Sequence, residues 1–294
     1  MRILVTGSNG QLGRELQKVL PEIGEVFPLD RFSCNLESEL SIRSAVERVK
    51  PNVIVNAGAY TNVDAAESDA DRAFAINGDA PRILAHAAAD IGALLIHYST
   101  DYVFDGEQPG RYTEETAPNP LSIYGRSKLA GEAGVAQSSA DYLILRTSWV
   151  FGPRGSNFLK TILSVARERE QLSVVADQIG APTPTSLIAN VTVTGILRFV
   201  EDKQSAPLGL FHLASAGETS WYEYACYILD AAERARHPLR VRSTSVVAVP
   251  STDYPRPARR PKNSRMDTTK IKAAFNLELP DWKAAVDQVL QEIL

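Results

Sequence analysis

Short runs of aliphatic and β-branched residues alternate with longer amphipathic stretches along the first half of the chain. Five apolar runs predict buried strands, at residues 2–6, 26–30, 52–56, 93–97 and 141–146. The stretches between them, such as 40–50 and 122–137, repeat apolar positions at helical spacing and predict helices. Strands that alternate with helices are typical of an α/β protein, so we expect a doubly wound parallel sheet of the Rossmann type.

The pattern after residue 150 is more mixed. Further helices and short strands are predicted, the helices at residues 158–170, 185–200, 221–234, 268–275 and 281–294 and the strands at 172–176 and 209–213. We therefore expect a Rossmann domain over residues 1–150 and a smaller C-terminal domain over residues 151–294. A segment at about 172–203 is expected to return to the Rossmann domain.

Composition and charge narrow the possible functions. The chain has 294 residues, a net charge of -4 and a pI of about 5.7, which makes nucleic acid and anionic membranes poor principal partners. Its two cysteines, Cys34 and Cys226, lie in different kinds of segment, so neither a disulfide framework nor a zinc site is indicated. No apolar run approaches the roughly 18 residues of a membrane-spanning helix, and no leader pattern precedes the first strand, so we expect a cytoplasmic protein.

The first apolar run leads directly into a glycine-rich loop with the spacing G-x-x-G-x-x-G, and a helical pattern follows it. Glycines let the backbone come close to a pyrophosphate, and the start of a helix offers free N–H groups to it. We expect dinucleotide contacts from the loop residues Gly7, Asn9, Gly10, Gln11, Leu12 and Gly13. The alternative is a glycine-rich turn that binds no ligand.

The ends of the next two strands bear on the choice of cofactor. Asp30 lies about 20 residues past the glycines, where a carboxylate can bond the adenosine ribose and favour NAD. Arg31 follows it and is suited to the 2′-phosphate of NADP, so we expect both NADH and NADPH to be accepted. The third strand ends in small residues that leave room for the cofactor, the run Ala57-Gly58-Ala59-Tyr60.

Two residues four positions apart on a predicted helix, Tyr124 and Lys128, suggest acid chemistry. Side chains at this spacing share one face, and a cation near a phenol lowers its pKa from about 10. Tyr124 is then a candidate proton donor, although the spacing also fits an ordinary surface helix. Thr100 falls where the fourth strand ends and is suited to hold a substrate oxygen, whereas His97, inside that strand, is more typical of a packed histidine.

These motifs together resemble those of the extended short-chain dehydrogenase/reductases. The resemblance rests on the glycine-rich start, the turn Asn56-Ala57-Gly58, the block at 99–106 and the pair Tyr124-x-x-x-Lys128. Further stretches, at 146–152, 177–183, 260–264 and 279–282, resemble the dTDP-4-dehydrorhamnose reductases within that superfamily. The match runs over nearly the whole chain.

The resemblance implies a reaction and roles for several residues. The enzyme would reduce the C4 ketone of dTDP-6-deoxy-L-lyxo-4-hexulose to dTDP-L-rhamnose with NADH or NADPH. Tyr124 would donate the proton, Lys128 would hold the nicotinamide ribose and keep the tyrosine pKa low, and Thr100 would orient the ketone. Tyr102 and Trp149 would contact the deoxyhexose, and the smaller domain would bind the substrate.

A proline-rich basic run at residues 250–262 offers charges for the diphosphate of a nucleotide sugar. Arg256, Arg259 and Arg260 are the candidates, because guanidinium groups bind phosphate oxygens in pairs. A basic loop of this composition is equally typical of a solvated surface.

The resemblance further implies a homodimer with Mg²⁺ held by glutamates at the interface, here Glu15 and Glu292. Asn190 stands near the position of a third ligand and weakens that expectation. Two other functions stay open: a non-catalytic regulatory subunit like that of methionine adenosyltransferase, and a nucleotide-sugar epimerase. An intact set of Thr100, Tyr124 and Lys128 favours the reductase.

Overall fold

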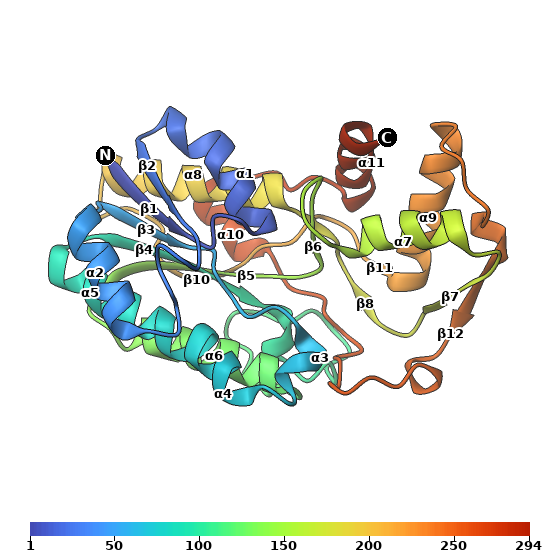
Figure 1. Cartoon of the computed structure of the whole chain (residues 1–294), viewed down its shortest axis with the longest axis horizontal. Coiled ribbons are helices and arrows are strands. Elements are labelled where there is room, and N and C mark those ends of the chain that lie inside the picture. Colours follow the sequence, from blue (N-terminus) through green and yellow to red (C-terminus); the bar gives the residue numbers. More distant parts are fainter.

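A computed structural model describes residues 1–294, and its larger unit is built around a parallel sheet of six strands in the order β10-β5-β4-β3-β1-β2 (Figure 1). The strands are β1 (Arg2–Thr6), β2 (Glu25–Leu29), β3 (Val53–Asn56), β4 (Leu94–Thr100), β5 (Asp141–Thr147) and β10 (Gly209–His212). The strand order reverses at β1, which lies between β2 and β3. A crevice outside the carboxyl ends of the strands is expected at such a switch point.

Helices cover both faces of this sheet (Figure 1). One face carries α1 (Gln11–Val19), α8 (Thr185–Glu201) and α10 (Thr269–Phe275), and the other carries α2 (Glu39–Val49), α5 (Ala80–Ile91) and α6 (Ile123–Ala136). Alternate side chains of β1 enter two different cores, Ile3 and Val5 in one and Leu4 in the other. Burial on both sides explains why the strands appear in the sequence as continuous apolar runs.

The smaller unit has a hydrophobic core of its own. Three helices and one strand pair build it, namely α7 (Phe158–Glu168), α9 (Trp221–Arg234), α11 (Trp282–Ile293) and the parallel pair β7 (Leu172–Val175) with β12 (Val246–Val249). Short strand pairs lie nearby, β6 (Val150–Phe151) with β9 (Thr183–Pro184) and β8 (Ile179–Gly180) with β11 (Thr219–Ser220).

The expected α/β class with a Rossmann sheet is confirmed, but the segment that was expected to return to it differs in detail. Within residues 172–203, only α8 packs on the large sheet, and β7 pairs with β12 in the smaller unit. Val174 of β7 lies in the core formed by α7 and α9, so packing keeps this strand there. The returning strand is β10, which adds to the edge of the sheet beside β5.

The chain between β3 and α5 passes through two short helices, α3 (Val63–Ala66) and α4 (Ala70–Phe74), and a π-helical turn at Ala75–Asp79.

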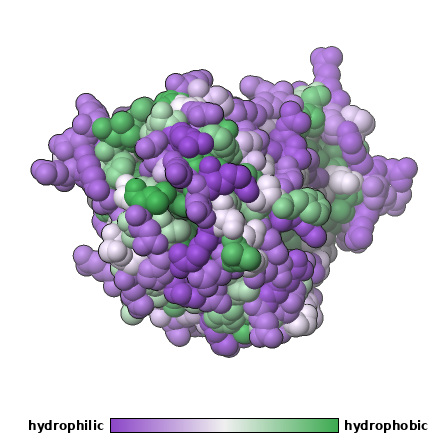
Figure 2. All heavy atoms as spheres, turned by 60° about the vertical axis from the view of Figure 1, so that its left-hand side comes forward, coloured by the Kyte–Doolittle hydropathy of each residue, from purple (hydrophilic) through white to green (hydrophobic).

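No helix of the chain combines the length and the apolar character needed to cross a membrane. On the face shown in Figure 2, apolar residues form small separate patches among polar ones. This distribution is ordinary for a globular protein surface.

A buried ion pair joins α6 to β5. Arg146 donates from Nε to Glu132 Oε1 at 2.8 Å and from Nη2 to Glu132 Oε2 at 2.6 Å, and both side chains are less than a tenth exposed. The Arg146 guanidinium also lies 5.1 Å from the centre of the Phe104 ring and 3.4 Å from His212 Nε2. Burial is the main cause that lowers the pKa of His212, to about 3, so this histidine is neutral beside the arginine.

Removal of one partner of this pair is expected to leave an uncompensated buried charge. Glu132→Ala should lower the free energy of unfolding by about 3–5 kcal/mol, measured by urea denaturation. Glu39→Ala is the control, because Glu39 forms an exposed pair with Arg43 at 2.7 Å and its loss should change stability little. Equal, small effects of the two substitutions would show that the buried pair does not stabilise the fold.

Candidate active site

A cavity of about 1010 Å³ opens at the carboxyl ends of the central strands and is lined by residues of both units. Gly7, Asn56, Thr100 and Thr147 enter it from the ends of β1, β3, β4 and β5 or directly after them. Of the residues predicted from sequence, the cavity brings together Gly7, Asn9, Gly10, Gln11, Leu12, Arg31, Ala57, Gly58, Ala59, Thr100, Tyr102, Tyr124, Lys128 and Trp149.

The glycine-rich loop forms a tight cradle at one end of the cavity. Gly7 has φ +65, and a Cβ built on it would lie 2.5 Å from the backbone of Gly58. A Cβ on Gly13 would meet the backbone oxygen of Gly7, so Gly13 supports the loop from behind rather than lining the cavity. Gly10 caps α1 without a side-chain hydrogen bond, and the first turn holds no acidic residue. This helix start fits a dinucleotide pyrophosphate.

A hydrogen-bonded chain of three side chains supports the loop after β3. Thr6 donates to Asn56 at 2.7 Å, and Asn56 Nδ2 donates to His97 Nδ1 at 3.1 Å. Thr6 also accepts the N–H of Gly58 at 3.3 Å. Burial lowers the pKa of His97 well below its usual value, so this histidine is neutral. It is a packed side chain, as predicted from its position within an apolar strand.

Tyr60, which was expected at the cofactor, does not line the cavity. Its N–H donates to Asn77 at 2.8 Å and its hydroxyl donates to Asp69 at 3.2 Å. Tyr60 therefore fixes the loop after β3 against the π-helical turn.

Asp30 and Arg31, which were expected at the adenosine of the cofactor, are placed differently with respect to the cavity. Asp30 accepts hydrogen bonds at Oδ1 from the Ser33 hydroxyl at 2.8 Å and from the N–H groups of Phe32 and Ser33 at 3.0 Å. The Ser33 hydroxyl is the main cause that lowers the pKa of Asp30. Asp30 does not line the cavity, whereas Arg31 does, with its guanidinium 5.3 Å from the centre of the Phe32 ring.

Tyr124 and Lys128 lie in the middle of the cavity on α6. The helix starts at a cap, where Ser122 Oγ accepts the N–H of Gly125 at 3.1 Å. A Cβ on Gly125 would meet the backbone oxygen of Tyr102, so glycine there lets α6 approach the end of β4 closely. Lys128 Nζ donates to the backbone oxygen of Tyr98 at 2.5 Å.

Burial dominates the acid–base behaviour of this pair. It lowers the pKa of Lys128 to about 8, while the charge of Glu132, one helical turn further along, acts in the opposite direction. It raises the pKa of Tyr124 to about 12, against a smaller opposing effect of the hydrogen bond with Thr100. The expected lowering of the Tyr124 pKa by Lys128 is therefore wrong, because burial raises it. The lysine amine is anchored to β4, and no hydrogen bond joins it to the phenol.

Asp101, which sequence reasoning did not select, also lines the cavity. Its Oδ1 accepts from Thr100 Oγ1 at 3.1 Å, while Oδ2 is buried without a partner. Burial raises the pKa of this carboxyl to about 6. Its position directly after Thr100 at a strand end was the signal in the sequence. Tyr102 follows, packed edge-on against Tyr124 with ring centres 5.5 Å apart.

Two stacked tryptophans form one wall of the cavity. Trp149 lies against Trp221 with ring centres 3.7 Å apart and an angle of 14° between the planes. Trp149 has φ 48, a strained backbone for a residue with a side chain, and Gly180 packs against its ring so closely that a Cβ would lie 2.8 Å away. Sequence reasoning missed Trp221, although it directly follows the helix cap at Ser220.

The remaining predicted residues lie outside the cavity lining. Arg256 donates to the Tyr254 hydroxyl at 2.8 Å on the surface. Glu15 pairs with Lys18 at 2.9 Å, and Glu292 lies near the end of α11. No group of three or more His, Cys, Asp or Glu side chains is placed to hold a metal ion within one chain.

The chain matches known proteins over its whole length. The model of the RmlD substrate binding domain family matches residues 1–294. A dTDP-4-dehydrorhamnose reductase of Burkholderia thailandensis is 43% identical over 296 residues, covering 100% of this chain and 99% of that protein. The chain belongs to the dTDP-4-dehydrorhamnose reductase family. The enzyme of that name from Escherichia coli strain K12 is also 43% identical, covering 100% of this chain and 98% of its own length.

Solved structures of the family share the fold. The dTDP-4-dehydrorhamnose reductase of Bacillus anthracis, in complex with NADP, superposes with a TM-score of 0.90 at 35% identity, covering 99% of both chains. A UDP-glucose 4-epimerase of Thermus thermophilus, in complex with NAD, superposes with a TM-score of 0.81 at 18% identity, covering 100% of this chain and 99% of its own. The likeness to the epimerase concerns the fold alone.

The cradle at Gly7 generates a prediction. Gly7→Ala forces a Cβ into the backbone of Gly58 and should weaken binding of a nicotinamide dinucleotide at least about tenfold, measured by fluorescence titration with NADPH. Gly92→Ala is a matched control, because Gly92 has the same φ of +65 but nothing within 4 Å of the added carbon. Similar loss of affinity in both variants would indicate general backbone strain rather than the closed cradle.

Proposed function

We propose that this chain reduces the C4 ketone of dTDP-6-deoxy-L-lyxo-4-hexulose to form dTDP-L-rhamnose, with NADPH or NADH as the reductant. The observation that carries the proposal is one cavity lined by both the glycine cradle and the set Thr100, Tyr124 and Lys128. The names of the full-length relatives at 43% identity support the same reaction.

The dinucleotide fits the residues present. The cradle leaves no space for a Cβ at Gly7, and the start of α1 directs its free N–H groups to the same place. When bound, a reduced nicotinamide supplies the hydride that the C4 carbon of the sugar receives.

Tyr124 supplies the proton. Its pKa of about 12 keeps the phenol fully protonated at neutral pH, so the proton is in place when an alkoxide forms at the sugar oxygen. The O–H bond of Tyr124 breaks as the new O–H bond of the product forms. Thr100 orients the ketone oxygen, for which its hydroxyl proton must turn from Asp101 Oδ1, its acceptor at 3.1 Å, and solvent then returns a proton to Tyr124.

Lys128 holds the ribose of the nicotinamide. An ammonium has three donors, and one of them is used by the backbone oxygen of Tyr98. The other two are available to ribose hydroxyls. This anchoring fixes the lysine in the cavity.

Aromatic residues are suited to contact the sugar. Tyr102 and Trp149 line the cavity next to Tyr124 and Trp221, respectively, and an aromatic wall suits the apolar face of a deoxyhexose. Arg256 lies outside the cavity lining and uses one of its five N–H donors on the Tyr254 hydroxyl, so its contact with the diphosphate stays a prediction.

The alternatives have less support. A regulatory subunit would not require a complete proton-donating set beside a cofactor cradle, and relatives at 39–43% identity over almost their full length are named reductases. The epimerases among the similar structures are only 17–18% identical, which supports a shared fold and not a shared reaction.

The resemblance also supports a homodimer with Mg²⁺ between Glu15 and Glu292. No three metal-ligating side chains gather within one chain, so such a metal would need ligands from a second copy. No step proposed above depends on that metal.

The proposed acid is tested by Tyr124→Phe, which removes one oxygen from the cavity. Turnover should fall at least ~100-fold while NADPH affinity stays nearly unchanged, as expected for loss of a general acid. The assay follows NADPH oxidation with the 4-keto sugar generated in situ and identifies the product. Tyr142→Phe on β5 removes the same atom outside the cavity and should be fully active. Turnover retained by Tyr124→Phe would refute the mechanism.

The different placement of Asp30 and Arg31 predicts a preference for NADPH over NADH. Asp30 is engaged by its own turn, whereas Arg31 faces the cavity and has no ion pair. Arg31→Ala should raise the KM for NADPH about 10- to 100-fold, since a hydrogen bond to a charged group contributes about 1.5–3 kcal/mol. The KM for NADH, which lacks the 2′-phosphate, is the internal control and should hardly change. Equal effects on both cofactors would contradict a role in phosphate recognition.

A further inference from the structure

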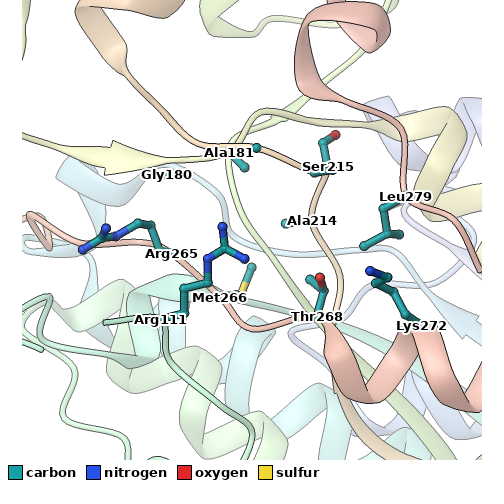
Figure 3. A pocket seen from close by; sticks show the side chains of 12 residues that line it. Arg111, Gly180, Ala181, Ala214, Ser215, Arg265, Met266, Thr268, Lys272 and Leu279 are labelled. Atoms are coloured by element: carbon teal, nitrogen blue, oxygen red, sulfur yellow. The ribbon is translucent and has the colours of Figure 1, made fainter. Parts of the chain in front are cut away.

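A second cavity, of about 130 Å³, shares no lining residue with the large one (Figure 3). It lies where the segment after β10 meets α10 and the strand β8. Its lining includes Arg111, Ala181, Ala214, Arg265, Met266 and Lys272. None of these residues takes part in the proposed reaction.

Three cations from separate parts of the sequence line this cavity: Arg111, Arg265 and Lys272. In Figure 3 the head groups of Arg111 and Lys272 extend towards Ala214 from opposite sides. Lys272 has neither an ion pair nor a side-chain hydrogen bond, and Arg111 has only a distant ion pair, 3.7 Å from Glu218. The donors of both side chains are therefore largely available.

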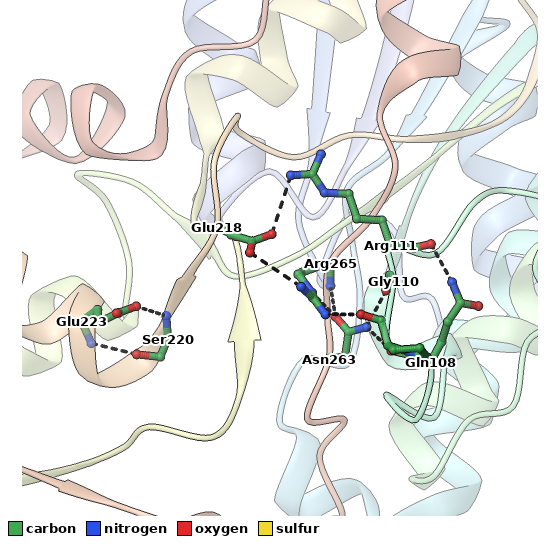
Figure 4. A network of polar contacts seen from close by, with 9 residues as sticks. Gln108, Gly110, Arg111, Glu218, Ser220, Glu223, Asn263 and Arg265 are labelled. Carbon is green, nitrogen blue, oxygen red and sulfur yellow. Dashed lines mark hydrogen bonds and ion pairs between the residues drawn. The ribbon is translucent and has the colours of Figure 1, made fainter.

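Three carboxylates near the cavity offset part of this charge, but none of them pairs with Lys272. Glu218 is shared between Arg111 and Arg265, at 3.7 and 3.6 Å (Figure 4). Asp267 accepts the N–H of Thr269 at 2.8 Å, and Asp281 accepts the N–H of Lys283 at 2.8 Å. Neither Asp267 nor Asp281 lines the cavity.

A hydrogen-bond network holds the arginines in position (Figure 4). Arg265 donates to Asn263 Oδ1 at 2.9 Å and to the backbone oxygen of Pro109 at 2.6 Å. Asn263 in turn donates to the backbone oxygens of Gln108 and Gly110, at 2.5 and 2.7 Å. The loop that carries Arg111 is thus fixed before any ligand binds, which lowers the entropy cost of binding.

The inner part of the cavity is apolar except for one hydroxyl. Ala181, Ala214 and Met266 form a small buried cluster there. Ser215 is 4% exposed, and its Oγ has no hydrogen-bond partner in the protein. In Figure 3 this hydroxyl points away from Arg111 and Lys272, so we do not count it among the donors to a ligand in the cavity.

We propose that this cavity binds a small oxyanion of the phosphate class, either inorganic phosphate or the phosphate of a small monoester. Guanidinium and ammonium groups are the usual side-chain donors to phosphate oxygens. The cavity volume is several times the roughly 30 Å³ that a water molecule occupies, so the cavity admits a tetrahedral oxyanion but not a dinucleotide. The proposal is independent of the reaction assigned to the large cavity.

Isothermal titration calorimetry of the full-length protein with inorganic phosphate tests this site. Saturating NADPH is included so that the glycine cradle is filled, and chloride keeps the ionic strength constant. We expect saturable 1:1 binding, weakened at least fivefold in Lys272→Ala and in Arg111→Ala. Both residues are substantially exposed, so the variants should fold.

Lys270→Ala is the matched control, since it removes the same charge from α10 outside the cavity and should leave phosphate binding unchanged. A second arm replaces phosphate by methyl phosphate. Binding of both ligands points to a monoester site, whereas binding of inorganic phosphate alone points to the free ion. Absence of saturable binding in the millimolar range, or equal affinity in wild type, Lys272→Ala and Arg111→Ala, would overturn the proposal.

Discussion

Burial of the central sheet on both faces is the constraint from which the site follows. Helices occupy both faces, so the carboxyl ends of the strands are where the interior opens to a ligand. Reversal of the strand order at β1 separates the connections there and leaves the crevice. The cradle at Gly7, the hydroxyl of Thr100 and the helix start before Tyr124 all meet at this edge.

Buried charge is the second constraint, and the fold distributes it over neighbouring elements. Lys128 is anchored to β4 through the backbone oxygen of Tyr98, and Glu132 on the same helix counters the loss of its proton. Glu132 is itself fixed by Arg146 of β5. The ion pair therefore positions the helix of the proposed acid as well as joining it to the sheet.

Sequence predicted those features that depend on local pattern. The strands, the glycine loop and the pair Tyr124 and Lys128 follow from spacing within short segments, and the structure places each at the same edge. Features that depend on contacts between distant segments were not predicted from the sequence. The pairing of β7 with β12 and the stacking of Trp149 on Trp221 join residues about 70 positions apart. The turn whose N–H and hydroxyl groups donate to the Asp30 carboxylate is local, but these hydrogen bonds depend on backbone geometry that the residue types alone do not determine.

The direction of the Tyr124 pKa shows why proximity in sequence is a poor guide to electrostatics. Spacing places the lysine on the same helical face, but burial acts on both groups and favours their neutral forms. Lys128 nevertheless remains mostly charged below its pKa of about 8 because Glu132 opposes the effect of burial. A neutral phenol is the state that a proton donor requires before reaction, and burial keeps Tyr124 in that state at neutral pH. A donor with a raised pKa keeps its proton until an alkoxide forms on the substrate, so burial of Tyr124 preserves the proton and also makes the phenol a weaker acid.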